Sequence, residues 1–477
     1  MQANPLPPLF STYNYLKLSI LFVILTTIVV VSAAVFAYST SSLAAGWADP
    51  PVRLQDPGTL GVTVNLYDDD ASARVDVTSQ GTLARVRRSA FIWDDYSDDP
   101  FTSGRLTVNM EAWSWNPAGY VAVTARSLAQ TWGGVCVAYY STNPPAGANM
   151  VYMLVKELHI TNANNQYSGL ITANSPLLFN LMGYRRGTGS NRFITIRRFS
   201  GTWSTVTSDS LTLAENTWFI FLGWREYSGT VGFTVYDTAG VQQDSPIGAA
   251  DTAFQVNLVG VGVYRAGITI TAHFDDFVAC ADANPSFVNV TGLEEGWTVY
   301  LYDGNGNTVN QATAGPDGKA SLNVLTRPIV RNARFEIRLG EAIILPTQSF
   351  SEVVGGDVYE CSVKRTAILG FKNQDSKAYC VYLKVESIQV PAGYSGSINL
   401  WVGPTAGTTP IQIIGSSVIV GTTSETVLNP FDTSYVYGTF SLCPTPPSQI
   451  VLALSLHYYI PSSKVEVEYP VEVSVHG

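Results

Sequence analysis

The sequence predicts a mainly β protein that begins with one hydrophobic helix and continues as a series of β-sandwich domains. First, 477 residues are too many for one compact core, because domains typically have ~100–200 residues. Second, residues 18–48 contain no charged side chain. Third, the chain beyond Gly46 is rich in Gly, Thr, Ser, Tyr and Val and alternates apolar with polar residues, a pattern typical of strands and turns. No amphipathic helix is expected after that point.

The composition excludes several classes of protein. Hydrophobic residues make up 46% of the chain and charged residues 13%, about half of the ~25% in an average soluble protein. A disordered acidic chain or a coiled coil would be more highly charged. The net charge of −10 comes from 27 Lys and Arg against 37 Asp and Glu. Since phosphate binding requires a basic face, we expect no nucleic-acid partner.

Residues 1–46 are expected to form the N-terminal hydrophobic helix. As a helix, the apolar stretch 18–37 would be about 30 Å long, which is the thickness of the hydrocarbon core of a bilayer. Lys17 is the only charged side chain before it, and positive charge favours the cytoplasmic side of a membrane. We therefore expect the rest of the chain to be extracellular, at the cell surface.

Three interpretations of this segment remain open. Val35-Phe36-Ala37 has the residue spacing of a signal-peptide cleavage site, and the apolar stretch is also long enough for a permanent membrane anchor. In the third interpretation, the segment resembles the N-terminal helix of archaeal type IV pilins and related filament proteins. Lys17–Ile20, Ile28–Val31 and Ala33–Tyr38 carry this resemblance. It implies a helix that lies in the membrane during biogenesis and later packs against copies of itself in a homopolymeric filament.

Residues 47–84 are interpreted as a linker with one β-strand, and residues 85–282 as the first large domain. In the linker, Val62, Val64 and Leu66 alternate with polar residues. The large domain resembles the concanavalin A-like or laminin G-like jelly roll. The resemblance is carried by the segments Asp94-Asp95-Tyr96, Asn216–Phe221, Gly229–Asp237 and His273–Phe277. It implies that the first and last strands of the domain lie side by side and bring two Asp-Asp pairs together.

Two further β domains are expected. Residues 283–345 resemble the small Ig-like modules of surface adhesins, with a strand at Trp297–Tyr302 followed by the turn Asp303–Asn307. Residues 346–477 are interpreted as a C-terminal β-sandwich. Its last segment alternates apolar and polar residues from Lys464 to His476, and Pro470, which has no N–H, suggests an edge strand or a bulge. This strand either completes its own sandwich or is donated to a neighbouring subunit.

The acidic pairs Asp94, Asp95 and Asp275, Asp276 are the candidate metal ligands. Hard oxygen ligands from two chain segments suit Ca²⁺, and the jelly-roll resemblance also implies a structural calcium near the ends of the domain. The alternative is that these carboxylates are solvated turn residues, with one Asp hydrogen-bonded to the backbone.

Other candidate residues concern glycans and disulfides. Trp113 and Trp115 share one face of a strand and are the candidate glycan contacts, although most tryptophans of this domain are expected in the core. Asn289 begins a glycosylation sequon. The five cysteines show no zinc spacing and are disulfide candidates or buried thiols, with Cys136–Cys280 as one allowed bridge. They are Cys136, Cys280, Cys361, Cys380 and Cys443.

No catalytic motif is recognisable. The four histidines are widely spaced, and residues 85–282 contain no Glu-x-Asp-x-x-Glu run of the kind that some jelly-roll glycoside hydrolases use. We therefore expect no enzyme but an extracellular structural and adhesive surface protein, a pilin-like filament subunit. The alternative is a membrane-anchored adhesin that binds surface glycans, and a glycoside hydrolase comes third.

Overall fold

The computed structural model confirms a mainly β protein. The helix expected for residues 1–46 lies outside the described residues, except for Ser41–Ser42, which form the short strand β1. Within the described residues, no helix has the length and hydrophobicity needed to cross a bilayer. The described residues are 41–42, 52–55, 62–66, 72–77 and 82–476, with gaps at 111, 126–131, 160–165, 187–191, 266–269, 341, 364–365, 391–395, 404–408, 442–449 and 464–465.

The chain divides into two compact units. Unit 1 comprises Met1–Thr82, Ile337–Pro346 and Ser362–Gly477, and unit 2 comprises Leu83–Glu336 and Thr347–Cys361. Each unit therefore contains segments that are far apart in the sequence. The exact domain boundaries expected from the sequence stay a prediction.

Most of unit 2 is a sandwich of two antiparallel sheets, which we call the large sandwich. One sheet has the order β15-β14-β13-β12-β19-β10-β7. Its strands are β7 (Thr107–Val108), β10 (Val135–Tyr140), β12 (Gln166–Ser175), β13 (Leu178–Arg186), β14 (Phe193–Ser200), β15 (Trp203–Ser210) and β19 (Leu258–Arg265). The 3-10 turn Trp132–Gly134 precedes β10.

The second sheet of the large sandwich has the order β18-β17-β16-β11-β20-β9-β8, and β6 also pairs with β20. Apolar side chains from both sheets, such as Val155, Leu170 and Phe221, fill one shared core, as two packed sheets require. The strands of this sheet are β6 (Ala90–Asp94), β8 (Trp113–Asn116), β9 (Tyr120–Ala125), β11 (Met150–His159), β16 (Thr217–Glu226), β17 (Thr230–Asp237), β18 (Ile247–Ala250) and β20 (Ile270–Ala281).

An ion pair connects the two sheets inside this sandwich. Glu157 on β11 accepts a hydrogen bond of 2.6 Å from Arg186 on β13, and both side chains are at most 1% exposed. Ser168 on β12 donates to the same carboxylate oxygen, and Arg186 also donates to the backbone carbonyl of Thr271 at 2.8 Å. Burial raises the pKa of Glu157, while Arg186 and Ser168 lower it. Each charge is tolerated in the core because the other neutralises it.

A small sandwich completes unit 2. One of its sheets has the order β24-β21-β27-β5, and the other has the order β23-β22-β25-β26. The strands are β5 (Leu83–Arg88), β21 (Phe287–Thr291), β22 (Thr298–Tyr302), β23 (Thr308–Thr313), β24 (Ala320–Asn323), β25 (Ile329–Leu339), β26 (Ala342–Val354) and β27 (Asp357–Cys361). Strand β5 thus comes from before the large sandwich, although the sequence suggested an Ig-like module made of residues 283–345 alone.

Unit 1 is another two-sheet sandwich, with the core residues Leu383, Ile398 and Leu456 among others. Its sheets have the orders β1-β3-β4-β36-β35-β29-β33 and β2-β28-β34-β30-β31-β32. The strands besides β1 are β2 (Val52–Gln55), β3 (Val62–Leu66), β4 (Ser72–Val77), β28 (Thr366–Asn373), β29 (Tyr379–Gln389), β30 (Ser397–Val402), β31 (Ile411–Ile414), β32 (Ser417–Val420), β33 (Thr426–Leu428), β34 (Thr433–Ser441), β35 (Ile450–Tyr459) and β36 (Glu466–His476).

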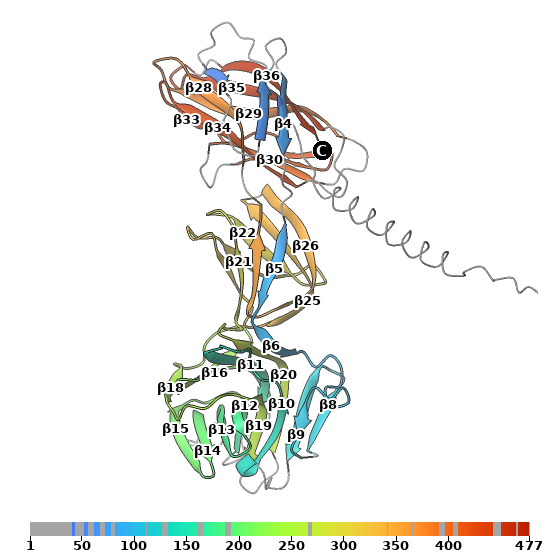
Figure 1. Ribbon diagram of the computed structural model, residues 1–477, viewed down its shortest axis with the longest axis vertical. Helices are drawn as coiled ribbons and strands as arrows, with labels where there is room; N and C mark the ends of the chain where they lie inside the picture. Colours follow the sequence, from blue (N-terminus) through green and yellow to red (C-terminus); the bar gives the residue numbers. More distant parts are fainter. Residues whose placement is uncertain are drawn as a thin grey trace, which may run out of the picture. The chain divides into compact units, whose positions relative to one another are not determined.

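The three sandwiches are nested along the chain. Strand β2 pairs with β28 and β4 with β36, so residues expected to form a linker instead supply strands to the last sandwich. In the part of the chain between β4 and β28, β5 pairs with β27. In the part between β5 and β27, β6 pairs with β20. In Figure 1 the blue strands β4 and β5 accordingly lie beside strands coloured yellow to red. The alternation of Val62 to Leu66 correctly indicated a strand but could not indicate its partners.

The last strand belongs to its own sandwich. Strand β36 pairs antiparallel with β35 over its whole length and parallel with β4 from Glu472 to His476. This confirms the first interpretation of the alternating C-terminal segment, in which it completes its own sandwich. Pro470 lies opposite Ser455, before the pairing with β4 begins, so its missing N–H is not needed for that ladder.

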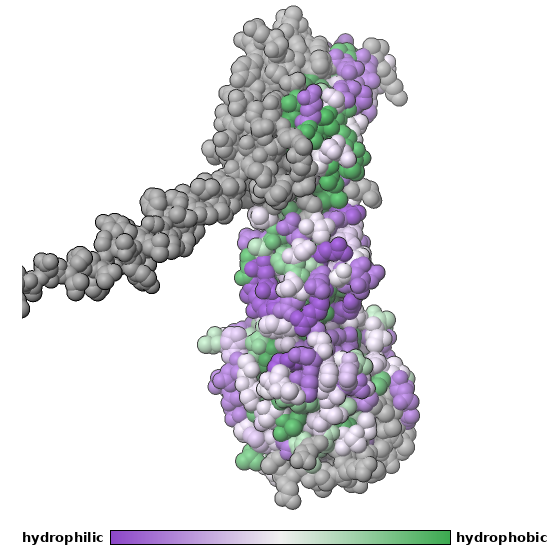
Figure 2. Space-filling view, turned by 90° about the vertical axis from the view of Figure 1, so that its right-hand side faces the viewer, coloured by the Kyte–Doolittle hydropathy of each residue, from purple (hydrophilic) through white to green (hydrophobic). Residues whose placement is uncertain are grey.

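One face of the described part of unit 2 is mainly polar. On the face shown in Figure 2, hydrophilic residues predominate over unit 2, and the hydrophobic ones form small scattered groups. The large hydrophobic side chains exposed in this unit are Val86, Leu177, Val241 and Phe287. Isolated residues of this kind are normal on a protein surface.

We predict that the Glu157→Gln variant loses about 3–5 kcal/mol of unfolding free energy, because it leaves the buried Arg186 guanidinium without its counter-ion. Urea unfolding monitored by tryptophan fluorescence measures this loss. The double variant Glu157→Leu, Arg186→Met removes both charges and should recover most of the stability. If the unfolding free energy of Glu157→Gln lies within about 1 kcal/mol of that of the original protein, the ion pair is not needed for stability.

Candidate functional site

The structure brings the two acidic pairs to one end of the large sandwich. Strand β6 runs antiparallel to β20, with Asp94 opposite Phe277 and Trp93 opposite Val278. The adjacent strands expected from the jelly-roll resemblance are therefore observed. At this end Tyr96 and Asp276 adopt positive φ angles of 49°, which marks tight bends where the two strands begin and end their pairing.

Asp94 is the centre of a buried hydrogen-bond network. Its carboxylate accepts from Arg105 Nε at 2.9 Å, from the Tyr140 hydroxyl at 3.0 Å and from the Tyr96 backbone N–H at 3.0 Å. Arg105 also donates to Asp98 at 2.6 Å. Burial raises the pKa of Tyr140 well above its ordinary value, so the hydroxyl keeps its proton and can donate.

Asp95 and Asp276 each have a basic partner as well. Arg331 Nε donates to Asp95 at 2.8 Å and Arg331 Nη1 to Glu352 at 2.7 Å, which ties the end of the large sandwich to the small sandwich within unit 2. Lys156 donates to Asp276. The pKa of Asp95 is lowered: burial raises it, but the hydrogen bonds from Arg331 and Ser97 outweigh that effect.

Asp275 and Asp276 differ from Asp95, because burial raises the pKa of both groups. Burial and the adjacent Asp276 charge raise the pKa of Asp275 to about 7, and the Lys156 charge offsets this only in part. The Asp275 carboxylate accepts the backbone N–H of Asp276 at 2.7 Å. The Asp275–Asp276 pair therefore holds a carboxyl group that changes its protonation near neutral pH.

These partners do not fit a calcium shell. Ca²⁺ requires 6–8 oxygen ligands, whereas Asp94, Asp95 and Asp276 each face a cationic side chain. Binding the ion would require Arg105, Arg331 and Lys156 to leave their carboxylates. Calcium at this site stays a prediction from the sequence, and the observed arrangement does not favour it.

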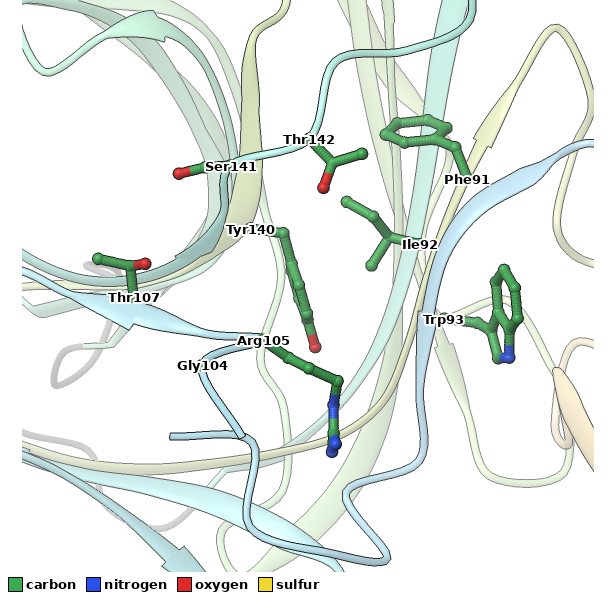
Figure 3. A pocket seen from close by; sticks show the side chains of 9 residues that line it. All are labelled: Phe91, Ile92, Trp93, Gly104, Arg105, Thr107, Tyr140, Ser141 and Thr142. Atoms are coloured by element: carbon green, nitrogen blue, oxygen red, sulfur yellow. The ribbon is translucent and has the colours of Figure 1, made fainter. Parts of the chain in front are cut away.

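A pocket of about 350 Å³ opens beside this network. In Figure 3 the Tyr140 ring and the Ile92 side chain lie near its centre, with the Arg105 guanidinium below the Tyr140 hydroxyl and the Trp93 ring on the other side of β6. Apolar and aromatic groups thus alternate with hydroxyl groups. The lining residues are Phe91, Ile92, Trp93, Gly104, Arg105, Thr107, Tyr140, Ser141 and Thr142.

The pocket carries little free positive charge. The Arg105 guanidinium makes hydrogen bonds to the carboxylates of both Asp94 and Asp98, and these hydrogen bonds raise its pKa. Because two carboxylates surround one guanidinium, an anionic ligand would gain little from Arg105. Hydroxyl groups of a ligand, by contrast, could use the exposed side chains of Thr107, Ser141 and Thr142 that line the pocket.

The Trp113 and Trp115 rings pack against the core of the large sandwich. Trp113 is 8% exposed and packs against Phe274 with ring centroids 6.0 Å apart. Trp115 is partly buried against the same core and donates its indole N–H to the Tyr96 carbonyl at 2.8 Å. The shared strand face predicted from the sequence therefore points inward, and we no longer regard this pair as glycan contacts.

Four of the candidate cysteines are buried thiols. Cys136 and Cys280 do not form the bridge that the sequence allowed. Cys136 lies 3.4 Å from the Met110 sulfur, whereas Cys280 donates to the Gly355 carbonyl at 3.2 Å. Burial raises the pKa of the Cys280 thiol, which makes it unreactive. The other two are Cys361 and Cys380, and Cys443 lies outside the described residues.

Asn289 lies within β21, where its side-chain carbonyl accepts a hydrogen bond of 2.7 Å from Ser321. Its glycosylation stays a prediction. At the acidic end, sequence reasoning identified the carboxylates but missed Arg105, Lys156 and Arg331. Arg331 lies 236 residues from its partner Asp95. No local spacing could have revealed that pair.

The chain resembles known proteins only in fold. No protein-family model and no curated protein matches it. Similar solved structures include a functionally unknown protein from Saccharomyces cerevisiae, with 12% identity and a TM-score of 0.29 over 42% of this chain and 96% of that one. Basic winged bean lectin has 11% identity and a TM-score of 0.28 over 43% of this chain and all of the lectin.

Enzymes are also among the similar structures. Xylan beta-1,4-xylosidase from Bacillus halodurans has 14% identity and a TM-score of 0.29 over 48% of this chain and 50% of the enzyme, so the match spans half of its length. A GH43 protein from Bacillus licheniformis has 15% identity and a TM-score of 0.31, over 50% of this chain and 56% of that one. At these values the likeness concerns the β-rich sandwich fold alone.

This finding overturns our expectation that the chain is not an enzyme. That expectation rested on the lack of a recognisable catalytic motif within a β-rich chain. Since structures with similar folds include xylosidases, the fold is compatible with an enzyme, and the exclusion was wrong.

We predict that the Asp275→Asn variant unfolds at a higher temperature than the original protein at pH 8 but not at pH 4. Folding raises the pKa of Asp275 from an ordinary value of 3.8 to about 7, so the folded state loses stability as the pH rises between these values. Asn removes the charge and can still accept the Asp276 N–H. Thermal unfolding at pH 4, 6 and 8 tests this, with a gain of roughly 2–4 °C for each kcal/mol.

The matched control is Asp209→Asn, which changes an exposed carboxylate that accepts only its neighbouring backbone N–H among the described residues. It should leave the pH dependence unchanged. A constant difference between Asp275→Asn and the original protein at all three pH values would contradict the assigned protonation change.

Proposed function

We propose that the pocket beside Asp94 binds a neutral sugar residue of a glycan, and that the protein is a glycan-binding surface protein. The observation that carries the proposal is the lining of this pocket, which combines aromatic and aliphatic walls with hydroxyl groups and a neutralised guanidinium. Its volume of about 350 Å³ falls within the range of small-molecule sites.

The chemistry of the walls supports this choice of ligand. A sugar ring has an apolar face of C–H groups and a rim of hydroxyl groups. The apolar face suits the partly exposed Phe91 ring, whereas the rim suits the Thr107 and Thr142 hydroxyls. The hydrogen bonds among Asp94, Arg105 and Tyr140 fix this side of the pocket before a ligand binds. Such preorganisation lowers the entropic cost of binding.

We predict that Thr142→Trp weakens glycan binding at least tenfold, because a large ring at this exposed rim position fills the pocket without disturbing the core. A glycan array identifies the ligand, and titration calorimetry then measures the dissociation constant. Asn143→Trp is the matched control, because it places the same ring on the next exposed residue, which does not line the pocket.

Two results would contradict this proposal: no glycan is bound, or Thr142→Trp binds as tightly as Asn143→Trp. The bound glycan should also be incubated with the protein and its reducing ends measured. Cleavage that Asp275→Asn abolishes would identify a glycoside hydrolase, since a carboxyl group that titrates near neutral pH can act as a general acid.

A location outside the cytoplasm and assembly through the N-terminal segment are further parts of the proposal. They are supported by the uncharged stretch 18–48 and by its resemblance to pilin helices. We predict that electron microscopy of sheared surface material shows fibres that contain this chain. Protein that is found only as single copies in the membrane fraction would instead support a membrane-anchored adhesin.

A further inference from the structure

A cluster of metal-ligating side chains lies on one face of the β29-β35-β36 sheet in unit 1. Residue His457 on β35 lies opposite Tyr382 on β29 and Glu468 on β36. Glu386, on β29, lies at the bulge between Val385 and Ser387. Glu386, His457 and Glu468 each offer one ligand atom, and these three atoms lie within 4.8 Å of one another. Three adjacent strands thus direct one nitrogen and two carboxylate ligands to the same place.

The His457 imidazole is held in one orientation. It is 6% exposed and stacks on Tyr382 with ring centroids 4.7 Å apart and an interplanar angle of 9°. Its Nδ1 lies 3.1 Å from Glu466 Oε1. Because an ionised carboxylate can only accept, Nδ1 carries the proton, and Nε2 of the neutral ring carries a lone pair. A carboxylate on the distal nitrogen is the usual arrangement behind a metal-bound histidine.

The Ser455 hydroxyl lies between two of the candidate ligands. Its Oγ is 2.8 Å from His457 Nε2 and 2.7 Å from Glu386 Oε1. The hydroxyl has one proton and can serve only one of these acceptors, and Lys384 supplies a second donor to Glu386 Oε1 at 2.9 Å. Ser455 is 1% exposed, so it holds the two ligands next to each other at the inner side of the cluster.

The charges of the cluster are also unbalanced. Glu386, Glu466 and Glu468 carry three negative charges, and Lys384, 2.9 Å from Glu386, supplies one positive charge. With a neutral imidazole the cluster therefore has an excess of two negative charges. The hydrogen bond from Lys384 lowers the pKa of Glu386, which keeps this carboxylate ionised. One divalent cation would neutralise this excess charge.

We propose that His457 Nε2 and the carboxylates of Glu386 and Glu468 bind Zn²⁺. An imidazole nitrogen with carboxylate oxygens suits zinc, whereas Ca²⁺ prefers oxygen ligands alone. Zinc–ligand bonds of about 2.0–2.2 Å require the ligand atoms to move closer together, and the two exposed glutamates can swing inward. Glu466 acts as a positioning residue through Nδ1. Since both glutamates face solvent, water completes the tetrahedron.

The experiment uses the full chain without a polyhistidine tag, freed of metal by a chelator. Titration calorimetry with ZnCl₂ should show one ion per chain, and Co²⁺ should give the visible absorption bands of a four-coordinate site. Glu386→Gln and Glu468→Gln each remove a charged ligand from the surface and should weaken Zn²⁺ binding at least tenfold. Ser455→Ala should retain binding, because it removes the hydroxyl but no ligand.

The matched control is Glu360→Gln, which changes an exposed glutamate outside the cluster and should bind Zn²⁺ like the original chain. The proposal is overturned if the chain binds no Zn²⁺ at micromolar concentration. It is also overturned if both ligand variants bind Zn²⁺ as tightly as Glu360→Gln.

Discussion

The structure depends on strand pairings that join the beginning of each sandwich to its end. Strand β6 pairs with β20, β5 with β27, and β4 with β36, so that each sandwich encloses the next along the chain. An unpaired strand edge exposes backbone N–H and carbonyl groups, and pairing with a distant segment satisfies them. Leu83 lies opposite Cys361, so the whole large sandwich is inserted in the chain between two paired strands of the small one.

Strand β20 connects this architecture to the site. It pairs with β11, β9 and β6, and therefore places the Asp275-Asp276 pair next to Lys156 on one side and the Asp94 region on the other. The pocket walls come from β6, from the segment around Arg105 and from the end of β10. No one of these segments forms a site by itself: β20 positions β6, whereas β10 belongs to the other sheet of the sandwich.

The chain uses its few charged residues in pairs. Only 13% of the residues are charged, yet several of them are buried in ion pairs, such as Glu157 with Arg186 and Asp251 with Arg225. Arg105, Arg331 and Lys156 neutralise the acidic end of the large sandwich in the same way. Buried charge is costly unless it is paired, so these contacts restrict which side chains can pack at each position. They also explain why the observed arrangement of these acidic residues does not favour calcium.

The sequence by itself determined that the chain is β-rich, that Val62–Leu66 is a strand, and that the last segment is an alternating strand. These features depend on neighbouring residues, because a half-buried strand requires alternation with a period of two. It also identified Asp94 and Asp276 but not the cationic side chains that pair with them. Only the tertiary structure decided those, along with the inward orientation of Trp113 and the meeting of His457 with Glu386 and Glu468. Such contacts join strands that are distant in sequence, and a period-two pattern specifies which face of a strand is buried but not which strand lies beside it.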